Sequence, residues 1–299
     1  MSTINAAQSI VEEAIHGPST PWISQVGRRL RTNPSAMFGL GLVLLMVAVA
    51  ILAPLIGRYN PDAFNVSILN QTPSPRHWFG TDYLGRDMWA RIVYGARVSL
   101  TAGIGIVAIS FAIGVPIGLA AGYGGKIVDD ILMRFIDVLL AFPGILLAIA
   151  IVTILGPGLY SAVIAIGIAG IPGYARIARG STIEIREHEF VQAARAQGAG
   201  RVHIMARHIL PNIVDPLIVL ATLNLSGAIL AAAALSFLGL GTQLPASDWG
   251  TLLSQGYDHM FQSWSQVTFP GLVIAITVLG INLFGDGIGD ALNPRLKAG

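Results

Sequence analysis

The stretch Ala36–Gly57, AMFGLGLVLLMVAVAILAPLIG, runs for 22 residues without a charge. About 20 apolar residues in a helix cross the ~30 Å hydrocarbon core of a bilayer. The stretch is therefore predicted to span a membrane. A cleaved signal peptide is the competing interpretation, strengthened by the pair Arg28-Arg29, but its apolar core would be ~7–15 residues long and closer to the N-terminus. A signal anchor that stays in the protein is favoured.

Five further apolar stretches are also predicted to cross the membrane. They cover about 98–123, 131–155, 160–178, 213–235 and 267–284. Composition agrees, because 54% of the chain is hydrophobic and 11% is charged, whereas soluble domains carry about 25% charged residues. The predicted fold is an all-α integral membrane protein with six transmembrane helices.

The polar stretches between these spans define the domain organisation. Residues 1–35 form an N-terminal tail, and 36–97 hold the first span plus a long polar segment. Residues 98–299 form a five-span core, with a charged loop at 179–212 between spans four and five.

Positive charge is distributed unequally over the two sides. With the N-terminus in the cytoplasm, 13 of the 18 lysines and arginines fall on the cytoplasmic side, including Arg295 and Lys297. Cytoplasmic loops carry an excess of Lys and Arg. Both termini and the 179–212 loop are therefore predicted to be cytoplasmic. The net charge of +2 gives no support to nucleic-acid binding, and the absence of cysteine excludes disulfides and thiolate metal sites.

Small and polar residues inside the spans indicate packing rather than ion coupling. Gly114, Gly118 and Gly122 share one helix face, which permits close approach of another helix. Arg134 and Asp137 are predicted to form an ion pair near the start of span three. The polar groups within the spans are uncharged, whereas secondary transporters usually place ionisable groups there. A secondary transporter or channel remains the alternative function.

The loop between spans four and five, Glu189–Asn212, is too polar to enter the membrane. Its first part, 190–197, favours helix. Gly198 and Gly200 are expected to break that helix, 201–209 to form a second helix, and Pro211 to end it. This helix–turn–helix would be a docking element for a soluble partner, with a solvated linker as the alternative.

The same loop resembles the "EAA" loop of bacterial ABC importer permeases. The residues that carry the resemblance are Gln192-Ala193-Ala194, Gly198, His208 and Leu210-Pro211. The general family pattern has Glu at the position of Gln192 and Ile at that of His208. In that family the loop contains the coupling helix that contacts the ATPase, so the resemblance implies this role for these seven residues.

Three further motifs resemble the dipeptide/oligopeptide/nickel branch of that family, and the extra first span resembles its C-type permease. The motifs are His77-Trp78-Phe79-Gly80-Thr81-Asp82 with Gly85-Arg86-Asp87, Leu235–Gly241 with Asp248-Trp249-Gly250, and Asn282–Gly287 with Asn293-Pro294. The resemblance covers about 36–297, nearly the whole chain.

The resemblance implies a subunit of a larger complex in a bacterial inner membrane. Its partners would be a second homologous permease, two ATPase subunits and an extracytoplasmic solute-binding protein. Short peptides are the first choice of solute, with nickel chelates, glutathione-like peptides and oligosaccharides still open. Pro172, Asn224 and Ser226 are the candidates for the solute pathway. An outer contact or gate is assigned to Gly80, Asp82, Arg86, Asp87, Asp248 and Trp249.

No catalytic residue, cofactor or metal is predicted in the chain itself. A phosphate-binding loop needs GxxxxGK[ST], but Ala120 precedes Gly125-Lys126 at the first glycine position and Ile127 follows it. ATP and Mg²⁺ are therefore expected on partner subunits. An aspartyl protease is rejected because Asp258 and Asp290 lie on opposite sides of span six, whereas a carboxylate pair needs ~3 Å. His203 and His208 are interpreted as surface residues.

Overall fold

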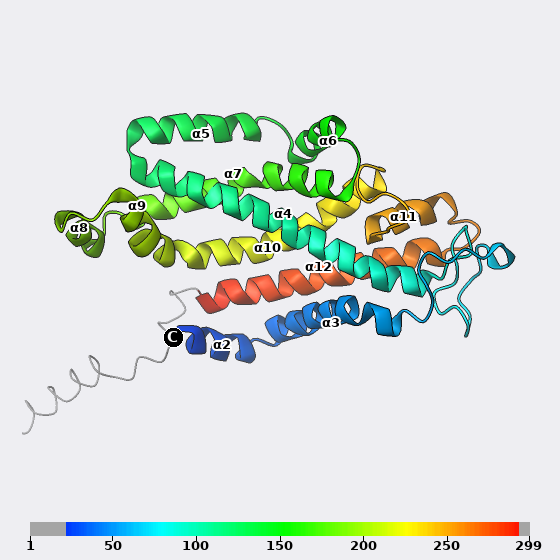
Figure 1. Ribbon diagram of the computed structural model, residues 1–299. Coiled ribbons are helices and arrows are strands. Elements are labelled where there is room, and N and C mark those ends of the chain that lie inside the picture. The colour runs from blue at the N-terminus through cyan, green and yellow to red at the C-terminus, as the bar shows by residue number, and fades with distance from the viewer. Residues whose placement is uncertain (1–21, 293–299) are drawn as a thin grey trace, which may run out of the picture.

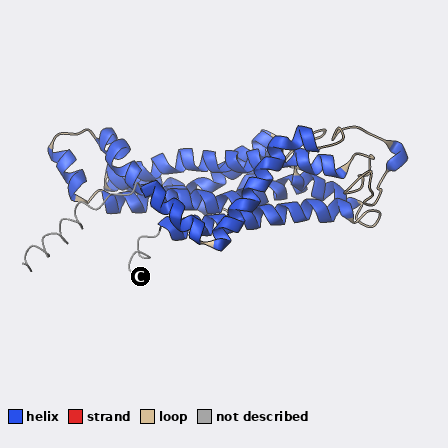
Figure 2. Ribbon diagram, turned by 90° about the horizontal axis from the view of Figure 1, so that it is seen from below, coloured by secondary structure: helices blue, strands red, loops and turns tan. Residues whose placement is uncertain are grey.

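The computed structural model describes residues 22–292, and the side chains from residue 27 onward. Most of the predicted N-terminal tail, Asn293-Pro294, Arg295 and Lys297 lie outside the described residues. The described part consists of helices and connecting loops (Figure 2). The helices in chain order are α2 (Trp22–Thr32), α3 (Pro34–Ile56), η1 (Val66–Ile68), α4 (Met88–Gly124), α5 (Lys126–Leu140), α6 (Gly144–Leu155), α7 (Leu159–Ile185), α8 (Glu189–Ala196), α9 (Arg201–Ile204), η2 (Met205–Ile209), α10 (Leu210–Phe237), α11 (Trp249–Asp258) and α12 (Ser265–Leu292).

Five helices are long and apolar enough to cross a membrane. They are α3, α4, α7, the continuous run Arg201–Phe237 and α12. The helices α5 and α6 meet at an 88° bend and form a sixth span if they are counted together. The prediction of an all-α protein with up to six spans is confirmed.

The third span is not the continuous helix that the sequence analysis expected. It breaks between Leu140 and Gly144, at Phe142-Pro143. Proline lacks the amide hydrogen that would continue the helix, and it disfavours helical backbone in the residue before it. The apolar run therefore contains two short helices in different directions.

Two other expected boundaries are wrong. The second span begins at Met88, ten residues before the expected start, and Asp87 caps it. Pro211 does not end a helix, because a π-helical turn, η2, joins α9 directly to α10. Pro211 is the second residue of α10 and follows this π-helical turn directly, so the chain stays helical through it.

The core of the bundle is the pair α4 and α7, which form the most extensive helix contact. Gly114, Gly118 and Gly122 of α4 lie against α7, and a Cβ atom at Gly114 would be 2.7 Å from the Ile171 carbonyl oxygen. The prediction that this glycine stripe serves packing is confirmed. Helix α10 packs on α4, α7 and α12, and α12 packs on α3.

The expected ion pair within α5 is wrong. Asp137 accepts a hydrogen bond from Arg176 of α7, with an N–O distance of 2.8 Å, instead of pairing with Arg134. Deeper along the same interface, Arg179 binds both oxygens of Asp129 at 2.5 and 2.6 Å. These pairs join α5 to α7.

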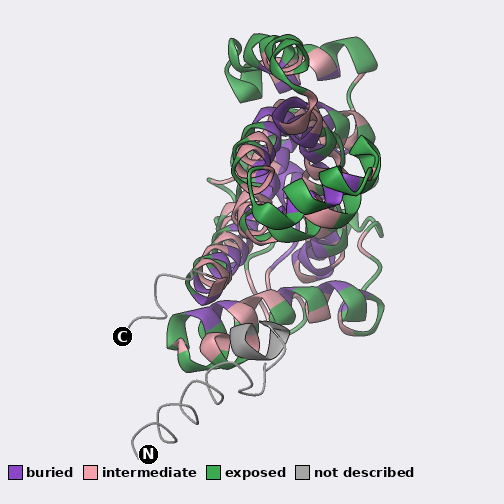
Figure 3. Ribbon diagram, turned by 90° about the vertical axis from the view of Figure 1, so that its left-hand side faces the viewer, coloured by how far each residue is buried: buried purple, intermediate pink, exposed green. Residues whose placement is uncertain are grey.

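The two ends of the bundle differ in construction. Helices α8 and α9 lie at one end, and α11 with the 57–87 segment lies at the other (Figure 1). We call these the α8 end and the α11 end. Buried residues gather along the middle of the bundle and exposed ones cover its outer faces (Figure 3). Large apolar side chains such as Leu55 (80% exposed) and Ile154 (84% exposed) face outward, as expected where the surroundings are lipid or another membrane subunit.

Candidate functional site

The α8 end carries a compact helical hairpin. Helix α8 stops at a left-handed residue, Gly198, with φ +83°. The Gly198 amide donates to the Arg195 carbonyl at 3.0 Å, and the Ala199 amide donates to that of Ala194 at 3.1 Å. This is the Schellman arrangement, which satisfies free carbonyl groups at a helix end and favours glycine at the left-handed position. The turn predicted at Gly198 is therefore confirmed.

The hairpin presents one buried and one exposed face. The buried side chains Val191, Ala194, Ile204 and Ile209 belong to the same apolar cluster as residues of α4, α7 and α10. On the other face, Gln192, Ala193 and Arg195 are exposed, as is Val202 at 74%. The hairpin is thus fixed to the ends of three long helices while its outer face is free for contact.

Polar contacts add to this attachment. Arg186, at the end of α7, donates to the Gly122 carbonyl of α4 at 2.6 Å. Gln192 donates to the Arg186 carbonyl at 3.1 Å. The guanidinium of Arg195 lies over the Tyr123 ring at 5.4 Å. A displacement of α8 would therefore act on the ends of both α4 and α7.

The predicted coupling residues fall into two groups. Gln192, Ala193 and Ala194 lie on α8, with Ala194 on the buried face, and Gly198 forms the turn. His208, Leu210 and Pro211 lie at the junction of η2 and α10. The first group lies in the hairpin and the second lies where the hairpin joins α10, and only part of each group is exposed.

A cavity of about 290 Å³ lies in the bundle between α4, α6, α7 and α10. Of the predicted pathway residues, Asn224 lines it. Ser226 is on the opposite side of α10, where its hydroxyl donates to Asn282 of α12 at 2.6 Å. Pro172 is buried in α7 and is not among the lining residues. Tyr174 lines the cavity too, and no sequence motif marked it.

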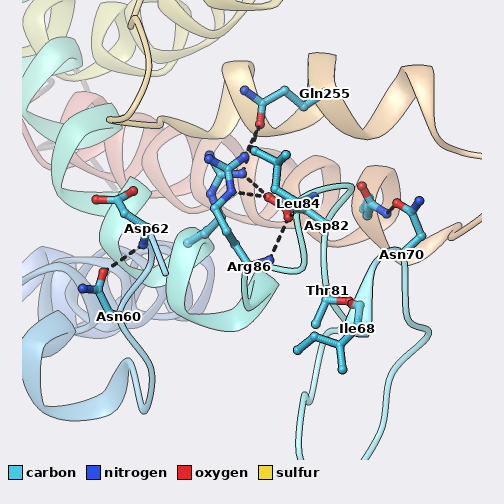
Figure 4. A network of polar contacts seen from close by, with 11 residues as sticks. Asn60, Asp62, Ile68, Asn70, Thr81, Asp82, Leu84, Arg86 and Gln255 are labelled. Atoms are coloured by element: carbon cyan, nitrogen blue, oxygen red, sulfur yellow. Dashed lines mark hydrogen bonds and ion pairs between the residues drawn. The ribbon is translucent and has the colours of Figure 1, made fainter. Parts of the chain in front are cut away.

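The α11 end contains a buried charge cluster (Figure 4). The Asp82 carboxylate accepts from Arg86 Nε at 2.7 Å and from Arg91 Nη1 at 2.5 Å. Both arginines also reach the Gln255 side-chain oxygen of α11, at 3.4 and 3.1 Å. The three charged residues are at most 1% exposed. One carboxylate thus fixes two arginines and ties the 57–87 segment to α4 and α11.

The other predicted outer residues also make their contacts within the chain. Asp87 caps α4 and pairs with His77 at 2.8 Å. Asp248 caps α11 and accepts from Ser236 and Thr242. The buried indole of Trp249 donates to the Ile92 carbonyl at 3.0 Å.

All six predicted outer residues are buried: Gly80, Asp82, Arg86, Asp87, Asp248 and Trp249. Any direct contact of this end with a second protein would therefore involve their exposed neighbours. Arg91 and Gln255 complete the cluster but were missed. The spacing of Asp82 and Arg86 marks a local pair, whereas nothing in the sequence indicates that Gln255 lies beside them.

The rejected functions find no support in the described residues. Between positions 22 and 292 no group of three or more His, Asp or Glu side chains could hold a metal ion. Asp258 ends α11, and Asp290 lies in the last turn of α12. Most of α12 separates them, about 37 Å along its axis for 25 residues.

These features define a class, a multi-pass helical membrane protein with an anchored hairpin exposed at one end and a cavity within its bundle. The chain belongs to the family described as binding-protein-dependent transport system inner membrane component, which matches residues 114–298. Residues 20–73 match the N-terminal TM domain of oligopeptide transport permease C. The protein is a permease subunit of an ABC importer in the inner membrane.

Named relatives resemble nearly the whole chain. The dipeptide transport system permease protein DppC of Alkalihalophilus pseudofirmus is 46% identical over 279 residues, 93% of this chain and 91% of the relative. The glutathione transport system permease protein GsiD of Pectobacterium atrosepticum is 44% identical, and the match covers 93% of both chains. The di/tripeptide transport system permease protein DppC of Pseudomonas aeruginosa is 45% identical, with 89% of both chains covered.

A solved structure shares the fold. A chain of the MetNI methionine ABC transporter, in an inward-facing conformation, superposes with a TM-score of 0.55 at 21% identity. The match covers 67% of this chain and 95% of that one.

Proposed function

We propose that this chain forms half of the translocation pathway of an importer for short peptides. Its partners are a second homologous permease, two ATPase subunits that bind ATP and Mg²⁺, and an extracytoplasmic solute-binding protein. The relatives named for dipeptide and di/tripeptide transport support peptides as the solute class. The glutathione relative is compatible with this, since glutathione is itself a short peptide.

The observation that carries the proposal is the α8–α9 hairpin. It combines an exposed face with a buried face that belongs to the same core cluster as α4, α7 and α10. Such an element transmits displacement, because closely packed cores move as units rather than deforming. The ATPase subunits bind its exposed face, with Gln192 and Ala193 at the contact. The hairpin lies in the cytoplasm, as the distribution of positive charge indicates.

The first test is to identify what co-purifies with the chain from native membranes in mild detergent. We expect an ATPase with a phosphate-binding loop and a second, related permease. A chain that purifies alone and remains stable would instead indicate a secondary transporter or channel.

A cross-linking experiment tests the assigned face. The chain has no cysteine, so Ala193→Cys introduces a single thiol on the exposed side of α8. We expect it to cross-link to the ATPase and to react with an impermeant maleimide only in inverted membrane vesicles. The matched variant Gln243→Cys places an exposed thiol at the α11 end, and it should react from the opposite side and give no ATPase cross-link. The reverse pattern would refute both the contact and the orientation.

A further inference from the structure

An open cavity of about 620 Å³ lies at the α11 end, beside the last turn of α3. Pro54 and Leu55 of α3 form one wall, and residues 57–62 with Tyr94 of α4 form the rest. Leu55 is 80% exposed, and Ile51, one turn earlier on the same helix, is 67% exposed. The cavity therefore joins the exposed apolar side of a membrane span to a polar loop.

Contacts with α4 fix the end of α3 and the start of this loop. The Trp89 indole donates to the Ile56 carbonyl oxygen at 2.8 Å. Gly57 lies so close to Tyr94 that an added Cβ atom would be 2.8 Å from the ring. The cavity is thus held at the point where the span ends.

Arg58 supplies a cation to the cavity. Its backbone is left-handed, with φ 56°, a conformation that is uncommon outside glycine and occurs preferentially at functional sites such as ligand clamps. Its guanidinium lies 4.4 Å from the centre of the Trp78 ring and 5.9 Å from that of Tyr59. Within residues 22–292 it joins no ion pair or hydrogen bond. Because arginine can stack on a ring and still donate from its edge, Arg58 is available to an anion.

Asp62 supplies the opposite charge. Its amide donates to the Asn60 side-chain oxygen at 2.9 Å, which shapes the loop (Figure 4). Its carboxylate is exposed and has no hydrogen-bond or ion-pair partner in the described part of the chain. Arg58 and Asp62 therefore line one cavity without binding each other, which leaves both charges free for a ligand that carries both signs.

Aromatic side chains mark the depth of the cavity relative to a bilayer. Tyr59 is 41% exposed and Trp78 is 50% exposed, and Trp78 contacts Trp89 edge to face at a centroid distance of 5.3 Å. Tyrosine and tryptophan are enriched at membrane–water interfaces. Their position at the end of α3 indicates that the cavity lies at the level of the lipid headgroups.

We propose that this cavity binds the headgroup of a phospholipid that carries a primary amine. The phosphate binds Arg58 through charge-assisted hydrogen bonds, and the ammonium group binds Asp62. The acyl chains lie along the exposed side of α3, on Leu55 and Ile51. This apolar wall favours a lipid over a free phosphate ion, which has no group to cover it. The bound lipid fastens the 57–62 loop to the bilayer.

The test uses the purified complex of both permeases and the ATPases, depleted of native lipid in detergent. The probe is a phosphatidylethanolamine with a photoreactive group in its acyl chain next to the glycerol. After illumination, cross-linked peptides are identified by mass spectrometry, and their yield is followed against lipid concentration. We expect saturable cross-links to residues 51–62 and to Tyr94. Loss of a hydrogen bond to a charged group should make Arg58→Gln weaken this binding by about fivefold or more.

Matched variants separate the two charges from general effects. Arg76→Gln removes an exposed arginine of the same segment that does not line the cavity, and it should leave the cross-linking unchanged. Arg58→Lys keeps the cation and should retain most of the binding. Asp62→Asn should reduce the preference for phosphatidylethanolamine over phosphatidylcholine, whose quaternary ammonium group cannot donate a hydrogen bond.

Four outcomes would overturn the proposal. They are cross-links that avoid the cavity residues, unchanged binding in Arg58→Gln, an equal loss in Arg76→Gln, and equal binding of the two lipids by the unaltered chain. Competition by millimolar inorganic phosphate as effective as that by unlabelled lipid would identify a site for soluble anions and refute the lipid assignment.

Discussion

The α11 end and the α8 end hold their segments by opposite means. At the α11 end, buried charges and capping carboxylates fix an irregular loop, with Asp82 at the centre of the cluster. At the α8 end, an apolar face fixes a short hairpin to the core, and the ion pair of Arg176 and Asp137, which joins α5 to α7, is more than half exposed. A buried charge cluster holds its geometry only if it stays complete. A packed hairpin with an exposed face can move as a unit.

The largest loss of folding stability is expected from Asp82→Ala. It leaves Arg86 and Arg91 buried without their carboxylate, a change that costs about 3–5 kcal/mol of folding stability for a buried pair. Thermal unfolding of the purified complex should show a large decrease in midpoint. Asp62→Ala removes an exposed carboxylate from the same segment and should leave the midpoint nearly unchanged. Equal midpoints for the two variants would contradict the assigned role of the cluster.

A smaller loss of folding stability is expected from Gly118→Ala, at the contact of α4 with α7. The added methyl would overlap the Ala175 carbonyl oxygen and approach the Ala178 Cβ to 2.6 Å. Overpacking of this kind costs about 1–3 kcal/mol. Gly173→Ala on α7 adds the same methyl where no atom lies within 4 Å. Only the first variant should lower the unfolding midpoint, and a comparable loss at Gly173 would argue against close backbone packing as the cause.

Gly198→Val tests the turn of the hairpin. Left-handed backbone costs an L-residue roughly 1–2 kcal/mol, and no neighbouring atom would clash with the side chain. We expect peptide uptake to be lost while membrane insertion is preserved. Gly198→Asn should retain more activity, since asparagine tolerates this conformation. Gly200→Ala, at φ −68°, is the control, and normal uptake by Gly198→Val would refute the coupling role.

The smallest effect is expected from Arg176→Ala. Its pair with Asp137 is 57% exposed on the arginine side and 58% on the aspartate side. Exposed ion pairs contribute about 0–1 kcal/mol. The midpoint of thermal unfolding should therefore shift by little, in contrast to the large decrease expected for Asp82→Ala. A loss as large as that of Asp82→Ala would mean that the α8 end also depends on its charges.

Much of the fold followed from local patterns. Apolar runs of spanning length predicted the helices, and the glycine repeat at Gly114 predicted a close helix contact that α7 does supply. The turn at Gly198 was predictable because one residue type dominates left-handed helix ends. The start of α4 was not, because Arg91 and Arg97 interrupt the apolar run there, and the contacts of Arg91 with Asp82 and Gln255 that allow its burial are not visible in the local sequence.

The sequence by itself determined that the chain resides in a membrane, that it crosses the membrane about six times, and that a polar hairpin lies between two of the spans. These depend on the length and composition of continuous segments. Only the tertiary structure decided which charges pair and which residues line a common cavity. Arg86 meets Gln255, 169 positions later, and Tyr174 and the start of α6 line the same cavity. Such juxtapositions depend on how helices cross in three dimensions, which no local pattern records.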